Sequence, residues 1–124
     1  MKLNHDLVRK VMLYLEDNLP FDGQVISYQI EIEGYSTEEI QYTVNKLYEA
    51  NYLKCVTFPA YKFKAILEIT WDGHCFLDNI RDDTVWEKIK QKASTIASAS
   101  IPVLSQIAST YISTLLQNNM LNVK

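Results

Sequence analysis

The segment from Leu67 to Lys88, LEITWDGHCFLDNIRDDTVWEK, holds a histidine, a cysteine and four aspartates between two tryptophans. If a helix begins at Trp71, then His74, Asp78 and Asp82 fall on one of its faces, at spacings of four residues. An imidazole and two carboxylates on one face could bind a hydrated divalent ion. A single helix face rarely supplies enough ligands, however, and the chain has just one further histidine. We therefore predict no metal site.

A cysteine nucleophile is the second chemistry that this segment suggests, because Cys75 adjoins His74. Neighbouring residues of a helix point about 100° apart and cannot form a nucleophile–base hydrogen bond. A buried free thiol is the simpler interpretation of Cys75. The chain also lacks the glycine-rich phosphate-binding motifs and the G-x-S-x-G motif, and it contains only three glycines. We expect neither enzyme activity nor a cofactor.

The same segment can instead be interpreted as a structural hinge. Thr70 is placed to cap a helix beginning at Trp71, and Thr84 with Glu87 forms a capping box that predicts a second helix after a break near residues 82–83. Arg81 would pair with Asp78 or with another carboxylate. The residues expected to face inward are the apolar Phe76, Leu77 and Ile80, with the two tryptophans, Trp71 and Trp86, as anchors at either end.

The elements that position this hinge are predicted from apolar spacing. Residues 4–19 repeat apolar side chains every three or four positions, which predicts a helix capped by Asn4 and ended by Pro20. The stretch VISYQIEIEG alternates, which predicts a half-buried strand. One side of this strand would carry Ile26, Tyr28, Ile30 and Ile32.

A second helix and a hairpin should follow this strand. Ser36 and Glu39 form a capping box, and the helix should end near Asn51 in a left-handed conformation. The stretches YLKCVTF and KAILEIT are rich in strand-forming residues and are joined by FPAYK, so they predict a β-hairpin. Pro102 should begin a last helix that runs to about residue 118.

This order of elements predicts the fold class α+β. It indicates a winged-helix-like domain, made of a helix, a strand, a helix and a β-hairpin wing, with a C-terminal helical extension. Residues 1–70 would form the core and wing, and residues 71–124 the helices that pack on it and on a partner subunit. Only one clear helix lies between the first strand and the wing, whereas a helix-turn-helix needs two.

Three segments also resemble a known family. DLVRKVM, GYSTEEIQYTVNKLYEANYL and TWDGHCFLDNIRDDTVW are similar to domain-of-unknown-function family 2513, which comes from phages and prophages. The resemblance spans roughly residues 6 to 90, and T-W-x-G-H-x-F-L-D-x-I-R-D-D is its most specific part. It implies a phage or prophage protein of winged-helix character and brings no established activity. The chain departs from the family pattern at Asn51, where Gly is usual, and at Thr43, where His is common.

Charge indicates where a nucleic acid could bind. The formal net charge is −3, so the chain as a whole does not attract phosphates, yet residues 46–64 hold four lysines and one glutamate, a local balance of +3. Lysines on a wing commonly contact phosphate. An equally strong alternative is that they keep an edge hairpin from aggregating. The candidate DNA contacts are Gln41, Asn45, Lys46, Lys54, Lys62 and Lys64.

The C-terminal segment has no charged residue from Ala93 to Val123. It is too polar for a membrane helix, and a helix with an apolar stripe and an uncharged polar back suits burial on two sides. The alternatives are packing within the monomer and a homodimer interface, and we favour the homodimer. The candidate interface residues are Leu104, Ile107, Ala108, Tyr111, Ile112, Leu115 and Leu116.

The sequence therefore predicts a non-enzymatic winged-helix protein that binds double-stranded DNA as a regulator. The alternative is a protein–protein module that occupies a host protein, in which case an acidic surface could imitate nucleic acid. That surface would be formed by Asp78, Asp82, Asp83 and Glu87. Charges throughout the first seventeen residues exclude a signal peptide or a spanning helix there. With two cysteines that form no disulfide pattern, we expect a cytoplasmic protein with no membrane association.

Overall fold

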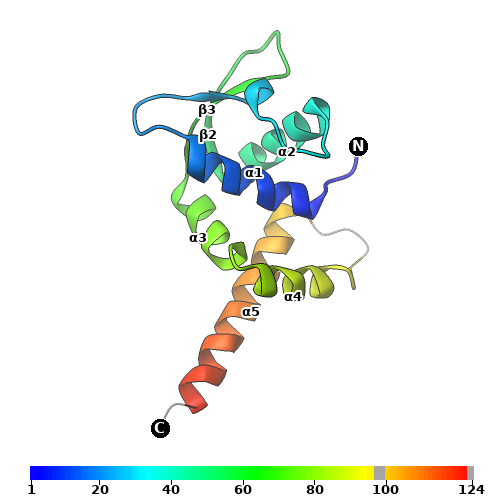
Figure 1. The fold of residues 1–124 in the computed structure, drawn as a ribbon, viewed down its shortest axis with the longest axis vertical. Helices are drawn as coiled ribbons and strands as arrows, with labels where there is room; N and C mark the ends of the chain where they lie inside the picture. Colours follow the sequence, from blue (N-terminus) through cyan, green and yellow to red (C-terminus); the bar gives the residue numbers. More distant parts are fainter. Residues whose placement is uncertain (97–99, 123–124) are drawn as a thin grey trace.

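The structure is a computed structural model that describes residues 1–96 and 100–122 (Figure 1). These residues form an α+β fold with five α-helices and one small antiparallel sheet. The elements are α1 (His5–Asn18), β1 (Val25–Ile26), η1 (Ser27–Gln29), α2 (Thr37–Glu49), β2 (Leu53–Thr57), β3 (Lys64–Ile69), α3 (Trp71–Ile80), α4 (Asp83–Ala93) and α5 (Ile101–Asn122).

The sheet has the strand order β1-β3-β2, with β3 in the centre. Strands β2 and β3 form the predicted hairpin, with Leu53 opposite Ile69 at its base and Thr57 opposite Lys64 near its tip. The long loop between them projects beyond the rest of the molecule (Figure 1). The hairpin prediction is confirmed, and the order of elements is the one expected from the sequence.

The predicted strand over VISYQIEIEG is wrong beyond Ile26. The chain leaves the sheet there and forms the 3₁₀-helix η1. The reason is local hydrogen bonding, because the Gln29 side chain accepts from the Ile26 N–H at 3.1 Å and offers the backbone an alternative to the strand ladder. Tyr28 is consequently 52% exposed while Ile30 is buried, so these two side chains do not share one face.

Helix capping follows the sequence closely. The Asn4 side chain caps α1, Ser36 and Glu39 form the capping box of α2, and the Thr70 hydroxyl caps α3. Asn51 has the predicted left-handed conformation, with φ of 69°. One cap differs from the prediction, because α4 is capped by Asp82, whose carboxylate accepts from the Val85 N–H at 2.9 Å, and not by Thr84.

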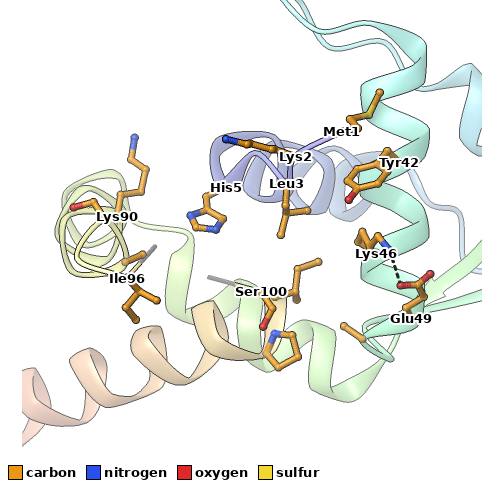
Figure 2. Close-up of a pocket in the computed structure, with 15 residues that line it drawn as sticks. Met1, Lys2, Leu3, His5, Tyr42, Lys46, Glu49, Lys90, Ile96 and Ser100 are labelled. Atoms are coloured by element: carbon orange, nitrogen blue, oxygen red, sulfur yellow. Dashed lines mark hydrogen bonds and ion pairs between the residues drawn. The ribbon is translucent and has the colours of Figure 1, made fainter. Parts of the chain in front are cut away.

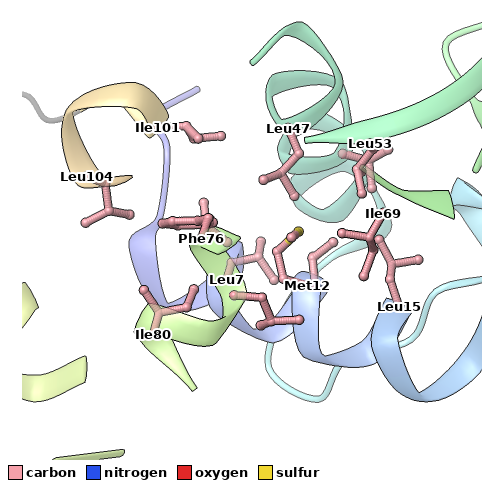
Figure 3. Close-up of a cluster of buried hydrophobic side chains, with 14 of the residues drawn as sticks. Leu7, Met12, Leu15, Leu47, Leu53, Ile69, Phe76, Ile80, Ile101 and Leu104 are labelled. Atoms are coloured by element: carbon pink, nitrogen blue, oxygen red, sulfur yellow. The ribbon is translucent and has the colours of Figure 1, made fainter. Parts of the chain in front are cut away.

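One hydrophobic core joins the two predicted regions, 1–70 and 71–124 (Figure 3). Leu7 and Leu47 come from the first region, whereas Phe76, Ile80 and Leu104 come from the second, and all five are fully buried in a single cluster. Helices α3 and α4 therefore complete the core, and the start of α5 closes it.

Helix α5 extends well beyond this core. A helix of 22 residues is roughly 33 Å long, from a rise of about 1.5 Å per residue. Its first turns pack on α3 and α4, whereas its distal half leaves the body of the molecule (Figure 1). Only part of its apolar stripe can therefore be buried within the chain.

Candidate functional site

The histidine and aspartates of the opening segment do not converge. Helix α3 ends at Ile80, so Asp82 lies beyond the helix face that would hold His74 and Asp78. Asp82 caps α4, and Asp78 accepts a hydrogen bond from Arg81 at 2.8 Å, as predicted. Within residues 1–96 and 100–122, no group of three or more His, Cys, Asp or Glu residues is arranged to hold a metal ion.

The predicted hinge is partly confirmed. Phe76, Leu77, Ile80 and Trp86 are buried as expected. The prediction for Trp71 is wrong, because this side chain is 80% exposed at the first position of α3 and anchors nothing. The first turn of α3 is set instead by the Thr70 hydroxyl, which accepts from the Gly73 N–H and donates to the Asn51 carbonyl at 2.7 Å.

A partly buried arginine, Arg9, holds the bend between α3 and α4. Arg9 of α1 donates to the carbonyls of Ile80 and Arg81, at 2.8 and 2.6 Å, and pairs with Asp83 at 2.6 Å. These carbonyls end α3, where backbone acceptors lack helical partners. The bend is therefore fixed by α1, and its polar residues serve the fold.

A second contact fixes α4 on α1. The Trp86 indole donates to Asp6 at 2.9 Å, and Lys90 pairs with the same carboxylate at 2.9 Å. Partial burial alone would raise the pKa of Asp6. The hydrogen bonds from Trp86 and Lys90 lower this pKa by more than burial raises it, so that the net pKa lies below the usual 3.8. This carboxylate is a structural partner for α4.

The two cysteines lie in different surroundings. Cys75 is exposed on α3, so its predicted burial is wrong. Cys55 on β2 is half-buried, and desolvation raises the pKa of its thiol to about 11. Cys55 therefore stays protonated at neutral pH and is a poor nucleophile.

The hairpin, η1 and α2 are joined through one buried hydroxyl. Ser27 of η1 accepts from the Lys64 N–H at 3.0 Å and donates to the Gln41 side chain at 3.5 Å. This single residue connects β3 with α2, and Lys64 also lies over the Tyr48 ring of α2 at 5.0 Å. These contacts join the three elements into one continuous surface.

Aromatic side chains gather where η1 meets the hairpin loop. Phe63 is the central ring, with the centroids of the other three rings at 5.1–5.2 Å from it. We call this group the wing cluster; its members are Tyr28, Phe58, Tyr61 and Phe63. Tyr28 and Tyr61 are 52% and 65% exposed, so the cluster presents ring surface to solvent. Tyr28 was absent from the sequence-based candidates, because its place beside the loop depends on the turn at η1.

The structure separates the candidate DNA contacts into two groups. Gln41 lies on the flank of α2 that meets η1, whereas Lys46 lies about 140° around the helix, from 100° per residue. Lys46 pairs with Glu49 at 3.0 Å and lies over the Tyr42 ring. The other candidates, Asn45 on α2 and Lys54, Lys62 and Lys64 of the hairpin, are partly or fully exposed.

The flank of Lys46 borders a cavity of about 900 Å³ (Figure 2). Leu3 from the N-terminal segment, His5 from the start of α1, Tyr42 from α2 and Ile101 from α5 surround this space. Two of its three lysines are paired with carboxylates of the chain, since Lys46 contacts Glu49 and Lys90 contacts Asp6 and Glu87. Lys46 is thus removed from the wing cluster and belongs to a different surface.

Carboxylates surround the N-terminus of α2. Glu38 and Glu39 occupy its first turn, and Glu31 and Glu33 precede it in exposed positions. A recognition helix contacts bases with its N-terminal residues, where phosphates lie close by. This end of α2 is therefore electrostatically unfavourable for nucleic acid, in contrast to the hairpin.

The candidate interface on α5 is divided by burial. Leu104 and Ala108 are fully buried within the chain and cannot meet a partner, and Ile107 and Tyr111 pack against the same core. This is packing within the monomer, on α3 and α4. Ile112 and Leu115 are only partly buried, and Leu116 is 57% exposed. The distal residues are the ones left for a partner.

The fold and this surface define a small α+β protein that carries an aromatic and basic hairpin beside an acidic helix. The chain belongs to the family described as hypothetical protein (DUF2513), domain-of-unknown-function family 2513, which matches residues 2–100. It is 31% identical over 122 residues to an uncharacterized protein of Haemophilus influenzae, a match that covers 94% of this chain and 99% of the relative. No solved structure matches the chain. In the part of the chain that the structure describes, no helix is long and apolar enough to cross a membrane.

Proposed function

We propose that this protein is a non-enzymatic, DNA-associated regulator with a winged-helix architecture, which contacts nucleic acid mainly through its hairpin. The observation that carries the proposal is the charge of this hairpin. Residues 53–69, which span the hairpin, include three lysines and one carboxylate, Glu68 opposite Lys54, a local balance of +2 in a chain of net charge −3. Lysines at such a site supply phosphate contacts, which dominate the affinity of proteins for nucleic acid.

The arrangement of elements supports a winged helix. The strand order β1-β3-β2 places the hairpin beside α2, and η1 occupies the position of the first helix of a helix-turn-helix. At three residues, η1 is far shorter than a normal helix. The hairpin therefore projects further than α2 from this side of the molecule (Figure 1), and the wing has the larger share of the proposed contact.

Helix α2 contributes less in this proposal. The Gln41 side chain is engaged by Ser27, and Lys46 is engaged by Glu49, which leaves Asn45 as the candidate base reader on α2. An Asn side chain can pair with adenine in the major groove. With Glu38 and Glu39 nearby, we expect base reading by α2 to be weak.

The proposal includes a homodimer through the distal half of α5. Residues 111–119 carry no charge, so two copies can approach there without repulsion despite their net charges of −3. An uncharged half-helix of Ser, Thr and Asn residues has little intrinsic stability in water, because short isolated helices are marginal. Packing of Ile112, Leu115 and Leu116 against the same residues of a second copy would stabilise it.

The DNA proposal is tested by fluorescence anisotropy with a mixed-sequence duplex at about 50 mM salt, since phosphate binding weakens steeply as salt rises. Replacing the exposed Lys54 and Lys62 by Glu should reduce affinity at least tenfold and flatten the salt dependence. The matched control replaces the exposed Lys2 and Lys88 by Glu, which changes the total charge equally. Equal loss in both variants would contradict contact through the hairpin.

The dimer is tested in the full chain by light scattering. Leu116→Glu changes an exposed residue and should leave the fold intact, as judged by the thermal unfolding transition. We expect the mass of the variant to fall to that of a monomer, whereas Gln106→Glu, an exposed position on the packed half of α5, should leave it unchanged. An unchanged mass for Leu116→Glu would contradict the proposed interface.

One observation favours a second candidate function, a protein-interaction module. The carboxylates around the start of α2 form an acidic surface that suits a basic protein partner better than a phosphate backbone. If neither a duplex nor a single strand binds at about 50 mM salt, this candidate replaces the first.

A further inference from the structure

We propose that the wing cluster is a binding site for unpaired bases, so that the preferred ligand of this protein is single-stranded DNA. The inference rests on the proposed function, since it assumes that the hairpin meets nucleic acid, and it adds the class of nucleic acid. Its basis is the juxtaposition of Tyr28 from η1 with Tyr61 and Phe63 from the hairpin loop.

The geometry of the cluster is that of a fixed platform. Tyr28 meets Phe63 edge to face, with an interplanar angle of 88°, and Tyr61 lies at 32° to Phe63. The hydrogen bond from the Lys64 N–H to Ser27 ties the two segments together at 3.0 Å. Because both tyrosines rest on the same half-buried ring, their side chains are already ordered. Stacking a base on either tyrosine therefore costs the protein little side-chain entropy.

The two tyrosines stay exposed although they take part in packing the loop. Phe58 and Phe63 are half-buried and contact each other within the hairpin, and Tyr28 joins the loop to η1 through its contact with Phe63. Tyr28 and Tyr61 nevertheless keep 52% and 65% of their surface exposed. Clustered apolar surface of this kind, rimmed by charge, marks an interaction site.

The positive charge nearest to the cluster in the sequence suits a phosphate backbone. Lys62 is exposed and lies between Tyr61 and Phe63 in the chain, whereas the amine of Lys64 lies over the Tyr48 ring of α2 at 5.0 Å. The combination of aromatic rings that stack on bases with cations that track the backbone is the physical basis of single-strand binding. A polar or acidic peptide would use the lysines but not the rings, and an apolar peptide would not need the lysines.

The acidic end of α2 favours a single strand over a duplex. A duplex docked by a winged helix would bring its phosphates to the N-terminus of α2, where Glu38 and Glu39 lie. A single strand can follow the hairpin and the wing cluster alone, away from these carboxylates. The bases of a single strand are also free to stack on the exposed tyrosines, whereas those of a duplex are already stacked.

The test compares anisotropy titrations of the full chain with a thymidine 20-mer and with a duplex of equal length. We expect tighter binding of the single strand, and Tyr61→Ala should weaken it by about 5- to 150-fold, from the usual loss on removing one stacked ring. Tyr61→Phe should keep most of the affinity. Trp71→Ala is the matched control, since Trp71 is an exposed aromatic residue outside the hairpin.

The outcomes separate the two proposals. If the single strand binds no better than the duplex and neither Tyr61→Ala nor Tyr28→Ala changes its affinity, while the Lys54 and Lys62 replacements still do, the wing-cluster inference is overturned and the proposed function remains. If neither nucleic acid binds, both are overturned. A thermal unfolding transition for each variant shows whether a loss of binding reflects the missing ring or a lost fold.

Discussion

The N-terminal body and helix α5 are stabilised in different ways. Within the body, elements far apart in the sequence are joined by specific polar bonds, such as Arg9 to the end of α3 and Ser27 to both α2 and β3. Helix α5 is attached to the body by apolar contacts and by the Lys92 amine of α4, which lies over the Tyr111 ring at 5.8 Å, and none of the residues of α5 is charged. The geometry of the body is therefore fixed by contacts within the chain, whereas the stability of the distal half of α5 depends on whether another molecule packs against it.

The same difference between the body and α5 indicates which surfaces are available for binding. In the body, the aspartates Asp78, Asp82 and Asp83 are engaged in ion pairs and helix capping, whereas the hairpin loop gathers exposed aromatic rings into one cluster. In α5, the buried half belongs to the fold and the exposed half remains available. Both proposed contacts therefore lie at projecting ends of the molecule, on opposite sides of one core (Figure 1).

The largest expected effect distinguishes the buried first half of α5 from its exposed distal half. Leu104→Ala removes a fully buried side chain and should lower the free energy of unfolding by about 2–5 kcal/mol. Leu116→Ala removes an exposed one and should change it by less than about 0.5 kcal/mol when measured on the monomer. Urea unfolding of dilute protein measures both. Similar losses in the two variants would contradict the division of α5 into a packed and a free half.

The junction of α3 with the hairpin should be the next most sensitive position. A Cβ atom at Gly73 would lie 2.3 Å from the Tyr52 carbonyl oxygen and 2.7 Å from Ile69 Cγ2. Because a backbone carbonyl cannot easily move, Gly73→Ala should destabilise the fold by about 1–3 kcal/mol, despite the better helix propensity of Ala. Cys75→Ala, at an exposed site of the same helix, serves as the control in the same unfolding measurement.

The Arg9 clamp tests whether polar bonds hold the body. Arg9→Met keeps most of the aliphatic length but leaves the carbonyls of Ile80 and Arg81 without this donor. With the Arg9 side chain only 14% exposed, we expect a loss of about 1–2 kcal/mol in thermal or urea unfolding. Lys10→Met, at the exposed neighbouring position, should cost much less. Equal effects would show that the clamp adds nothing specific.

The smallest effect is the pH dependence at Asp6. A carboxylate whose pKa is lowered in the folded state contributes stability above its unfolded pKa, near 3.8, and loses it as the pH falls through the lower folded value. Asp6→Asn should therefore reduce stability at pH 7 by less than about 1 kcal/mol, given the exposure of this pair. The gap between wild type and variant should close below about pH 4. Asp17→Asn, at an exposed position of the same helix, is the control variant for the loss of one carboxylate.

Local sequence signals predicted most of the elements correctly. Asn4, Ser36 with Glu39, and Thr70 each cap the helix expected of them, and Asn51 ends α2 in the predicted conformation. These features depend on hydrogen bonds within a few residues, which a sequence displays directly. The error over residues 27–33 has the same kind of cause, because the alternation of VISYQIEIEG satisfied the strand pattern while the side chain of Gln29 favoured a turn.

The surface predictions were only partly available from the sequence. The lysines of the hairpin could be named from composition, but Tyr28 could not, since its neighbours in the wing cluster follow it by 30 residues or more. In the same way, the stripe on α5 was visible from its spacing, yet its division into buried and exposed halves depends on where α3 and α4 end. Periodicity identifies an apolar face but not how much of it a neighbouring element covers.

The sequence by itself determined the order of elements, their caps, the charge of the hairpin and the absence of charge in α5, because each of these depends on residue type and short spacing. The tertiary structure decided which polar residues hold the fold, that Trp71 is exposed, that Tyr28 joins the wing cluster and that α5 is half free. These are properties of contacts between distant segments. They arise only when the core is closed and each side chain either finds a partner or is left in water.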